Sequence, residues 1–281
     1  MHLFEETSAP QLLEEALPLF AAREAENNLP LGVLQMVCQG QRREPAPWLW
    51  SVREGGQLVG VAVRTPPSPL LVSTLPAAGG AALADAILAR AVFPLPINGP
   101  SDVVDEVTRA LTQRGGTEIE LLRNMRLFQL CQVTPAVAMS GAMRRTSTAD
   151  APVLVQFLDA FEREAVPEQV GTRDLRVVVE TMLAQGRAFL WQDGDLVGAM
   201  AAFNRRVGSG TSIGAVYTPP ALRRRGYATA LVAALSQHML DDGCAYTCLF
   251  TNLANPVSNS IYPKVGYHPV GDVRHVSVRR V

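Results

Sequence analysis

The sequence lacks the features that mark a membrane, secreted or nucleic-acid-binding protein. Its 281 residues carry a formal net charge of −1, so no overall excess of positive charge attracts nucleic acid or an anionic lipid surface. The Ala-rich stretch 76–96 contains Asp85, Arg90 and three prolines, which exclude a membrane-spanning helix. The first residues lack the basic start of a signal peptide. We therefore expect a cytoplasmic protein with no nucleic-acid or membrane partner.

Cysteine and histidine are too scattered to predict a metal centre. The chain has four of each. Cys244 and Cys248 lie close together, but no histidine pattern matches their spacing, so a zinc site is not expected. Cys38 and Cys131 stand alone. Buried free thiols in a reducing compartment are the simpler expectation for all of them.

What the sequence does contain predicts a large core and two domains. Apolar residues make up 48% of the chain and charged residues 18%. At roughly 150 residues per domain, the length corresponds to about two domains. A short segment of Pro, Gly and Ser at 133–141 supplies a natural boundary. The expected domains are residues 1–135 and 136–281.

The two halves repeat one order of predicted elements. Each half has two helix-like stretches, then a strand, a glycine-containing turn and a second strand, which is typical of a β-hairpin. The helical stretches are 9–25 and 30–40, then 150–163 and 173–185, and the hairpin strands are 48–52 with 58–63, then 188–191 with 196–201. The shared order predicts two tandem copies of one fold.

The second half goes on to predict a layered α/β fold with a mixed sheet. Its later elements are a strand at 211–218, a helix at 226–241, a strand at 246–251, a helix at 256–265 and a final strand pair. The first half has a matching strand before Gly79 and Gly80, but no arginine loop follows that strand. We expect that half to be structural, or to act as a lid for the site of the second half.

The most informative segment is Arg223-x-x-Gly226-x-Ala228, at the junction of the strand at 211–218 and the helix at 226–241. The free N–H groups of a helix start and the helix dipole both favour an anion such as a pyrophosphate. Gly226 lets the backbone approach a phosphate closely, and Ala228 keeps the first turn open. The pattern is not a nucleotide P-loop, because no Gly-Lys-Ser/Thr follows.

Side chains around this loop can add to an anion site. Thr229 offers a hydroxyl, Arg223 can close the loop or contact phosphate, and Arg224 and Arg225 can meet further phosphates. A capped surface helix with a solvated basic run explains the same residues, as does a small RNA-contacting patch.

A second cluster occupies residues 255–267, directly after a buried-looking strand. Asn255 suits a helix N-cap, Pro256 suits the first helical position, and Gly266 suits a helix stop. The segment therefore predicts a short, well-delimited helix.

Tyr262 stands out within this helix. Val257, Ile261 and Val265 form an i, i+4, i+8 core stripe, and Tyr262 lies about 100° from it, so core packing does not account for the tyrosine. A phenol with a pKa of about 10 is suited to protonate a departing alkyl thiolate. A half-buried tyrosine at the edge of the core is the alternative.

Together the two clusters resemble the GCN5-related N-acetyltransferase (GNAT) family. The resemblance covers residues 142–281 and rests on the order strand, Arg-x-x-Gly-x-Ala loop, helix, strand, Asn-x-x-Ser-x-x-x-Tyr helix and Gly-Tyr. The form with Val216-Tyr217-Thr218-Pro219-Pro220 looks like a subgroup of predicted acetyltransferases with a degenerate N-terminal copy of the fold. The resemblance implies a mostly antiparallel central sheet flanked by helices, and transfer of an acetyl group from acetyl-CoA to an amine.

The resemblance also assigns roles to residues. Backbone amides of residues 224–229 would hold the pyrophosphate of acetyl-CoA, and the strand edge would pair with the pantetheine arm. Tyr262 would protonate the leaving thiolate. Ala228 replaces a glycine often found at the end of the loop, and Thr218 stands where a valine is usual. The implied cofactor-binding residues are Val216, Tyr217, Thr218, Arg223, Arg224, Arg225, Gly226, Tyr227, Ala228, Thr229, Asn255 and Ser258.

The implied reaction is attack of a neutral amine on the thioester, with both reactants oriented and the oxyanion stabilised. The acceptor would be a small-molecule or peptide amine, and an antibiotic, a polyamine, an amino acid and a protein N-terminus all stay open. Glu162, Glu164 and Glu168 are candidates for a general base, with a solvated helix face as the plain alternative.

Other functions stay open at this point. The enzyme could transfer a longer acyl chain, or transfer to a thiol or hydroxyl. A non-catalytic acyl-CoA-binding module with the first half as a partner surface is a further reading, and an RNA-contacting basic loop is disfavoured by the net charge. The first half could shape the acceptor pocket or form a homodimer interface.

Overall fold

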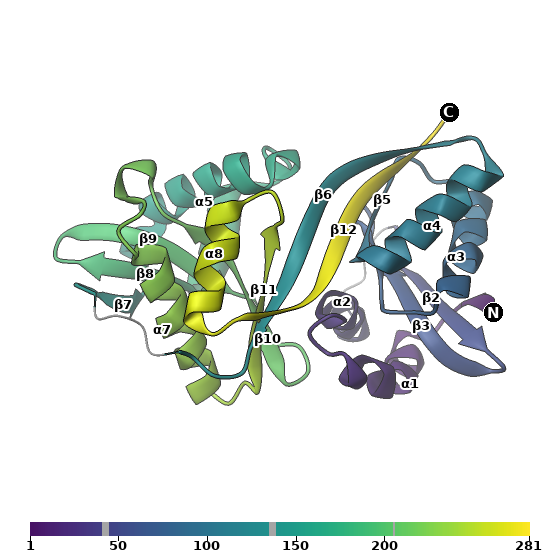
Figure 1. Ribbon diagram of the computed structural model, residues 1–281, viewed down its shortest axis with the longest axis horizontal. Helices are drawn as coiled ribbons and strands as arrows, with labels where there is room; N and C mark the ends of the chain where they lie inside the picture. Colours follow the sequence, from purple (N-terminus) through teal and green to yellow (C-terminus); the bar gives the residue numbers. More distant parts are fainter. Residues whose placement is uncertain (41–44, 135–138, 205) are drawn as a thin grey trace. The chain divides into compact units, whose positions relative to one another are not determined.

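The computed structural model describes residues 1–281 except 41–44, 135–138 and 205, together with the side chain of Val257 (Figure 1). The chain forms two compact units, one of Met1–Leu127 with Val270–Val281 and one of Phe128–Pro269. The predicted boundary between residues 135 and 136 lies outside the described residues. The two units are not simply the two halves of the sequence, because the last residues of the chain belong to the first unit.

The first unit is a sheet with helices. Its strands lie in the order β1-β2-β3-β4-β5-β12-β6, and β4 and β5 are parallel. Helices α3 and α4 pack on the sheet around one apolar cluster, and α1 and α2 contact β3. The elements are β1 (His2–Glu5), α1 (Ala9–Ala22), α2 (Asn28–Cys38), β2 (Trp48–Glu54), β3 (Gln57–Arg64), β4 (Leu70–Val72), α3 (Ala77–Arg90), β5 (Leu95–Pro100), α4 (Ser101–Arg114), β6 (Thr117–Leu130) and β12 (His268–Arg280).

The second unit repeats this order of strands and helices. Its strands lie in the order β6-β11-β10-β9-β8-β7, and it receives the end of β6 from residue 128 on. The elements are β7 (Ala142–Arg145), α5 (Ala151–Ala165), α6 (Leu175–Ala184), β8 (Ala188–Asp193), β9 (Leu196–Phe203), β10 (Gly210–Tyr217), α7 (Tyr227–Asp241), β11 (Tyr246–Asn252) and α8 (Pro256–Val265), with 3-10 turns at Thr148–Asp150, Pro167–Gln169 and Pro220–Leu222.

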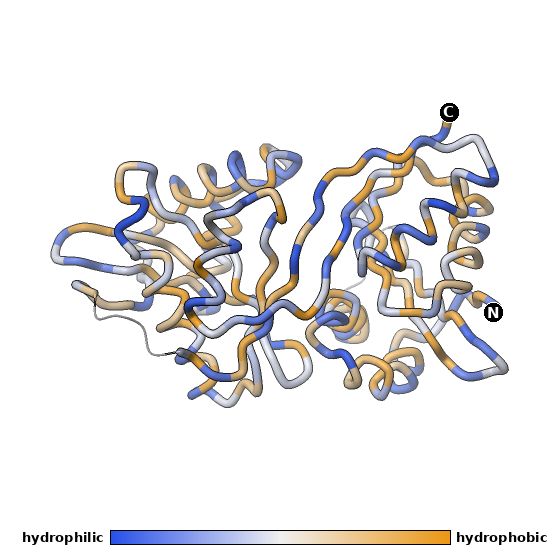
Figure 2. The backbone as a smooth tube through the Cα atoms, in the orientation of Figure 1, coloured by the Kyte–Doolittle hydropathy of each residue, from blue (hydrophilic) through white to orange (hydrophobic). Residues whose placement is uncertain are grey.

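Alternation along β8 explains why helices cover both faces of the second sheet. Successive side chains of a strand point to opposite faces. Ala188 and Leu190 join the cluster beneath α5 and α6, while Phe189 and Trp191 join the cluster beneath α7. The helices match this arrangement, since apolar and polar residues alternate along α5 (Figure 2).

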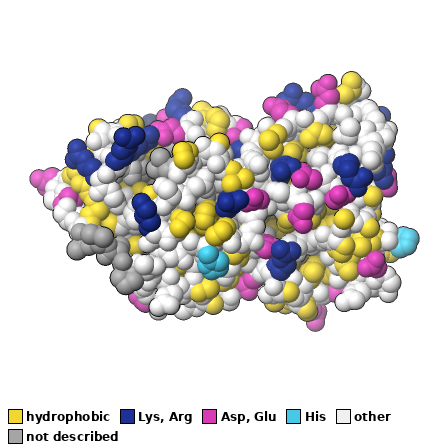
Figure 3. Space-filling model, viewed as in Figure 1, with side chains coloured by type: hydrophobic (Ala, Val, Ile, Leu, Met, Phe, Trp, Pro, Cys, Tyr) yellow, Lys and Arg dark blue, Asp and Glu magenta, His cyan; other side chains and the backbone are white. Residues whose placement is uncertain are grey.

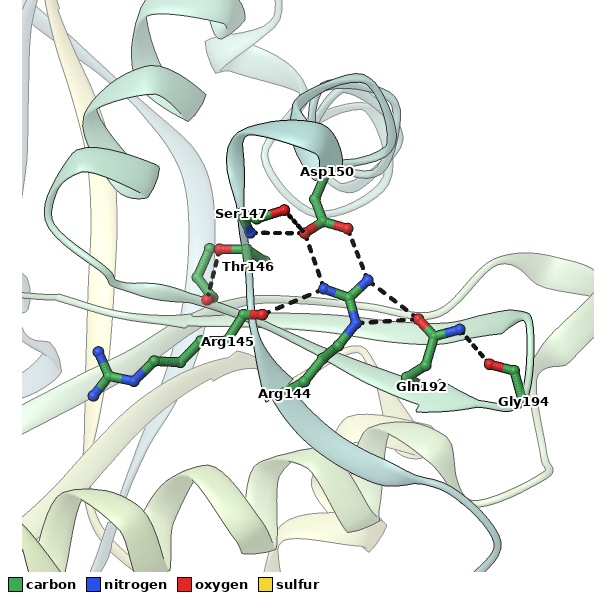
Figure 4. Close-up of polar contacts among 8 residues, drawn as sticks. Arg144, Arg145, Thr146, Ser147, Asp150, Gln192 and Gly194 are labelled. Atoms are coloured by element: carbon green, nitrogen blue, oxygen red, sulfur yellow. Dashed lines mark hydrogen bonds and ion pairs between the residues drawn. The ribbon is translucent and has the colours of Figure 1, made fainter.

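A polar network fixes the corner between β7 and α5 (Figure 4). Arg144 donates from two nitrogens to the Asp150 carboxylate at 2.7 and 2.9 Å, and also to the side-chain oxygen of Gln192 on β8 at 3.2 Å. The backbone N–H of Ser147 donates to Asp150 at 2.7 Å, which closes a capping box. Hydrogen bonding from Arg144 lowers the pKa of Asp150 to about 2.

The strand exchange is a feature that the sequence halves did not predict. Strand β12 pairs with β5 in antiparallel register from Val273↔Pro100 to Val278↔Leu95, inside the first unit. The last strand of the second set of elements therefore completes the first sheet. The final segment of β6, in turn, belongs to the second unit.

The predicted fold class and the two predicted hairpins are confirmed. A mixed, mostly antiparallel sheet flanked by helices is present, and both predicted hairpins are found. All four cysteines are free, but only Cys244 and Cys248 are buried, so the expectation of buried thiols is wrong for exposed Cys131 and half-buried Cys38. Among the described residues, no helix has the length and apolar character needed to cross a membrane, and no cluster of potential metal ligands occurs. Acidic and basic side chains are mixed over the face in Figure 3.

Candidate functional site

Strands β10 and β11 separate part-way along their length. They pair in parallel at Gly210↔Tyr246, Thr211↔Thr247 and Ser212↔Cys248, and among the described residues their pairing goes no further. Beyond that point β10 pairs with β9 and with no other strand that the structure describes, with a bulge between Gly214 and Tyr217. A Cβ placed on Gly214 would meet nothing within 4 Å. The edge of β10 that faces away from β9 is therefore open over residues 214–217.

The bulge turns the strand backbone at the same place. Ala215 adopts a φ of 49°, an uncommon conformation for a residue with a Cβ. Bulges often occur next to functional sites, where they redirect backbone and side-chain groups. Val216 and Thr218 are half-buried on either side of buried Tyr217. The predicted strand edge of residues 216–218 thus lies at this opening.

The loop that follows presents backbone donors in one direction. Arg224 and Gly226 both have positive φ values, 64° and 91°, and Gly226 is the N-cap of α7. Alternation between left-handed and other conformations makes neighbouring N–H groups converge into an anion-binding nest. Ala230 is the first residue of this helix start whose N–H bonds back, to the carbonyl of Gly226. Among the described residues, none accepts a backbone hydrogen bond from the N–H groups of residues 224–229.

Tyr227 anchors the first turn of α7. Its ring lies against Gly198 of β9, where an added Cβ would come within 2.7 Å of the ring. Its hydroxyl donates to Asp193 at 3.0 Å, and Ser140 donates to the same carboxylate oxygen at 2.8 Å. The buried side chain therefore faces the sheet, and only the backbone N–H of Tyr227 is available to a ligand. Ala228 and Thr229 are half-buried beside it.

Arg223 closes the loop through its side chain. Its Nε donates to the carbonyl of Thr218 at 3.0 Å, and its Nη2 contacts both oxygens of Glu164, at the end of α5, at 2.7 and 2.6 Å. Its guanidinium also lies 5.9 Å from the ring centroid of Tyr217. Of the two roles open for Arg223, loop closure is the one that its contacts fulfil. Arg224 and Arg225 are exposed.

The start of α8 lies at the end of β11, where the two strands diverge. Asn255 caps the helix by accepting the N–H of Ser258 at 3.1 Å, and Pro256 takes the first helical position, as the sequence predicted. Asn259 was not singled out from the sequence, yet its amide donates to three carbonyls, including those of Asn252 and Asn255, and its oxygen accepts from Thr251. Asn259 thus fixes the junction of β11 and α8.

Tyr262 lies in the core, so the helical-wheel argument about its surroundings was wrong. It is 6% exposed and packs with Phe128 of β6 and Tyr267, at centroid distances of 6.1 and 5.9 Å. The stripe of α8 residues could not reveal this, because β6, β11 and α7 wrap around the helix. Burial raises the pKa of Tyr262 to about 12. Its neighbour Tyr267 differs, because its hydroxyl is hydrogen-bonded to Ser236 and Thr247.

The three candidate bases are not equivalent. Glu162 is 2% exposed, and its Oε1 accepts from two nitrogens of Arg173 at 2.9 and 2.5 Å, so its carboxylate is held in a buried ion pair. Glu164 is the partner of Arg223. Glu168 is exposed in the 3-10 turn Pro167–Gln169, and it too has an interaction partner. A solvated helix face, the plain alternative, does not describe Glu162.

The corresponding place in the first unit is closed. A Cβ on Gly99 of β5 would come within 2.9 Å of the carbonyl oxygen of Val72, so β4 and β5 remain close where β10 and β11 separate. Leu75 fills the turn, since a Cβ on Gly79 would lie 2.5 Å from it. The N–H of Thr74 donates to Asn27 at 3.0 Å. This turn is therefore packed by the Leu75 side chain, which distinguishes it from the turn of residues 224–229.

Comparison with known proteins agrees with this geometry. The model of the acetyltransferase (GNAT) family matches residues 155–267, which span α5 to α8 and contain the separated strands and the loop. The second unit contains a GNAT acetyltransferase domain. No curated protein matches the sequence.

Solved GNAT structures also resemble the whole chain. A GCN5-related N-acetyltransferase from Sphaerobacter thermophilus has a TM-score of 0.65 at 13% identity, covering 99% of this chain and 95% of that one. A GNAT-family acetyltransferase from Colwellia psychrerythraea has a TM-score of 0.59 at 14% identity and full coverage of both chains. A tandem GNAT protein from the clavulanic acid biosynthesis pathway has a TM-score of 0.58 at 13% identity, covering 99% of this chain and 98% of that one. At such identities the likeness shows the fold, and here it extends over both units.

Proposed function

We propose that the second unit binds acetyl-CoA and transfers its acetyl group to the primary amine of a small molecule or peptide. The observation that carries this proposal is the row of N–H groups at residues 224–229, which have no acceptor among the described residues and stand beside the opening between β10 and β11. Unpaired donors at a helix N-terminus stabilise a pyrophosphate. The GNAT domain implies acyl transfer from an acyl-CoA.

The open edge of β10 suits the pantetheine arm of acetyl-CoA. A pantetheine arm carries amide groups that can extend a sheet in the manner of an added strand. Val216 and Thr218 would supply backbone partners, with an N–H directed at the thioester oxygen as negative charge develops there. Asn255 and Ser258, at the start of α8, would contact the arm from the other side.

Tyr262 would donate a hydrogen bond to the leaving sulfur. With a pKa of about 12, the phenol is a weaker acid than an alkyl thiol with a pKa of about 8.5, so complete proton transfer to the thiolate is unfavourable. This observation favours a second candidate, a module that binds acyl-CoA without turnover. Tyr262→Phe separates the two candidates. An enzyme loses turnover in this variant, whereas a binding module keeps its affinity for acyl-CoA.

The experiment that tests the cofactor site is a thermal shift with acetyl-CoA. At about 100 times Kd, linkage gives roughly 2.7 kcal/mol of stabilisation. Thr229→Asp, in the first turn of α7, places a negative charge where the pyrophosphate would sit while favouring the helix dipole. We expect the free protein to melt as before and the acetyl-CoA shift to vanish.

Val177→Asp is the matched control. Val177 is exposed and occupies the same helical position in α6, so this variant carries the same new charge away from the site. A shift that survives in Thr229→Asp, or vanishes in both variants, would contradict the site. Release of free CoA thiol from acetyl-CoA and longer acyl-CoAs, over a panel of amines, thiols and alcohols, then identifies acyl group and acceptor class.

We also propose that the first unit is a degenerate copy of the same fold. Its order of elements repeats that of the second unit, and its corresponding turn is filled by Leu75. The role of this unit would then be structural, or would rest on a site of its own.

A further inference from the structure

The first unit contains a pocket that shares no lining residue with the turn filled by Leu75. The pocket has a volume of about 430 Å³, within the size range of small-molecule sites. Its apolar wall includes Trp48, Pro66, Pro67 and Val92, and two arginines, Arg64 and Arg90, complete it. Trp48 and Arg64 are cross-strand partners on β2 and β3, while Arg90 ends α3.

Arg64 is a buried cation without a carboxylate partner among the described residues. The residue is 5% exposed, its Nε donates to the carbonyl of Ser68 at 2.9 Å, and its Nη1 is buried with no hydrogen-bond partner in the described part of the chain. Burial and the charge of Arg90 lower the pKa of its guanidinium. A buried charge with an unmade hydrogen bond is unfavourable unless something compensates it.

The groups around Arg64 compensate it only in part. Its guanidinium carbon lies 4.5 Å from the ring centroid of Trp48, which provides a cation–π contact. The guanidinium carbon of Arg90 lies 4.5 Å from the same centroid, so a second positive charge shares that ring. Arg90 has its own acidic partner, since Glu5 accepts from it at 2.6 Å. In the part of the chain that the structure describes, no carboxylate pairs with Arg64.

The chemistry of the walls limits what that anion can be. A guanidinium is a planar fork that matches a carboxylate in two-point contact. The prolines and Val92 offer no hydrogen bonds from their side chains, so they suit a hydrocarbon or aromatic body rather than a second charge. Both observations favour a single carboxylate on an apolar body of modest size.

We propose that the first unit binds a small apolar monocarboxylic acid in this pocket. The carboxylate contacts the guanidinium of Arg64, with Arg90 adding a second positive charge. The apolar body lies against Pro66, Pro67 and Val92. This site stands independently of acyl transfer by the second unit.

Benzoate is the probe for the test, with isovalerate as a second acid. Unfolding temperature and tryptophan fluorescence are followed during titration, against sodium chloride at the same ionic strength and against inorganic phosphate. Benzoate at about ten times a Kd on the order of 1 mM raises the unfolding temperature by about 3 °C, and chloride does not. A phosphate response equal to that of benzoate, or no response to either acid, overturns the proposal.

Two variants of opposite sign keep the test independent of folding defects. Arg64→Gln weakens benzoate binding by roughly tenfold or more, because it removes the charge that the carboxylate contacts. Val92→Glu, at a residue that is 43% exposed, supplies a carboxylate from the chain itself. That variant melts higher than the wild type without benzoate and no longer responds to it. Unchanged melting of Val92→Glu together with an undiminished benzoate response overturns the proposal even if Arg64→Gln fails to fold.

Arg109→Gln is the matched control. Arg109 is an exposed arginine of the same unit, paired with Glu106 on α4. This variant responds to benzoate as the wild type does. Equal weakening in Arg109→Gln and Arg64→Gln would show that benzoate responds to general surface charge and would overturn the assignment.

Discussion

Arg223 and Glu164, far apart in sequence, form a two-oxygen ion pair at 2.7 and 2.6 Å that joins the end of α5 to the loop before α7. Both side chains are nearly half exposed, at 44% and 48%. Exposed pairs of this kind stabilise a fold by only about 0–1 kcal/mol. The pair is therefore better placed to position the loop than to stabilise the unit.

Removing this pair should weaken cofactor binding while leaving stability nearly unchanged. We expect Glu164→Gln to raise the Kd for acetyl-CoA by about three- to tenfold, because a less constrained loop must be ordered on binding. Isothermal titration calorimetry measures the change. Asp159→Asn, which removes the Asp159–Arg163 pair on the same helix, is the control and should leave the Kd unaltered. A Kd unchanged by Glu164→Gln would argue against the positioning role.

The same variant tests Glu164 as a general base. Once an acceptor amine is known, a positioning residue changes affinity but leaves the shape of the pH–rate profile intact. Loss of the acidic limb of the profile in Glu164→Gln would instead assign the base to this carboxylate.

The two neighbouring tyrosines should respond differently to loss of the hydroxyl. Tyr262→Phe is expected to lower turnover by about 10- to 100-fold and to spare stability, since no described residue hydrogen-bonds to its hydroxyl. Tyr267→Phe should instead destabilise the fold by about 1–2 kcal/mol, because Ser236 and Thr247 lose their shared partner. Steady-state kinetics and urea unfolding of both variants check this. Equal destabilisation by the two substitutions would make Tyr262 a packing residue.

Glu162 should matter for stability rather than for proton transfer. Its carboxylate is buried, whereas its partner Arg173 is 44% exposed. Glu162→Gln leaves a weakened, uncharged contact inside the unit, and we expect a loss of about 1–2 kcal/mol. Arg173→Gln is the more severe test, because it leaves a buried carboxylate unpaired and should cost more. Chemical denaturation of both variants gives the order, and the reverse order would contradict the reading of Glu162 as the desolvated partner.

The Arg144–Asp150 contact predicts a specific acid sensitivity. The folded-state pKa of Asp150 is about 2, below the ordinary value of 3.8. The carboxylate therefore contributes stability that is fully present above about pH 4 and is lost as the pH falls towards 2. The difference corresponds to about 2 kcal/mol.

Asp150→Asn isolates that contribution. We expect the variant to be less stable than the wild type at neutral pH and to approach it as the pH falls through about 2, where the carboxylate of the wild type becomes protonated. Urea unfolding over the acidic range measures the gap. A gap that stays constant with pH would mean that the contribution of Asp150 comes from its helix-capping bonds with Ser147 alone.

Local patterns predicted most of the fold. The hairpins, the helix starts at Asn255 and Pro256, and the loop at Arg223–Gly226 depend on neighbours within a few residues, and each appears at its predicted place. The environment of Tyr262 was missed because it is set by Phe128 and Tyr267, which come from other elements. The partner of Glu162 was missed for the same reason, since Arg173 returns from a loop after the helix has ended.

The pairing of β12 with β5 has a consequence for biosynthesis. In the first sheet β12 lies between β5 and β6, so the ribosome must make residues 273–278 before β5 gains its partner on that side. The unit whose residues emerge first is therefore the last to be completed. The apolar edge of β5 stays unpaired until β12 has been synthesised. Exposed strand edges promote association between chains. Nascent chains stalled before residue 270 should therefore recruit chaperones through the first unit, although nearly all of its own sequence has already been made.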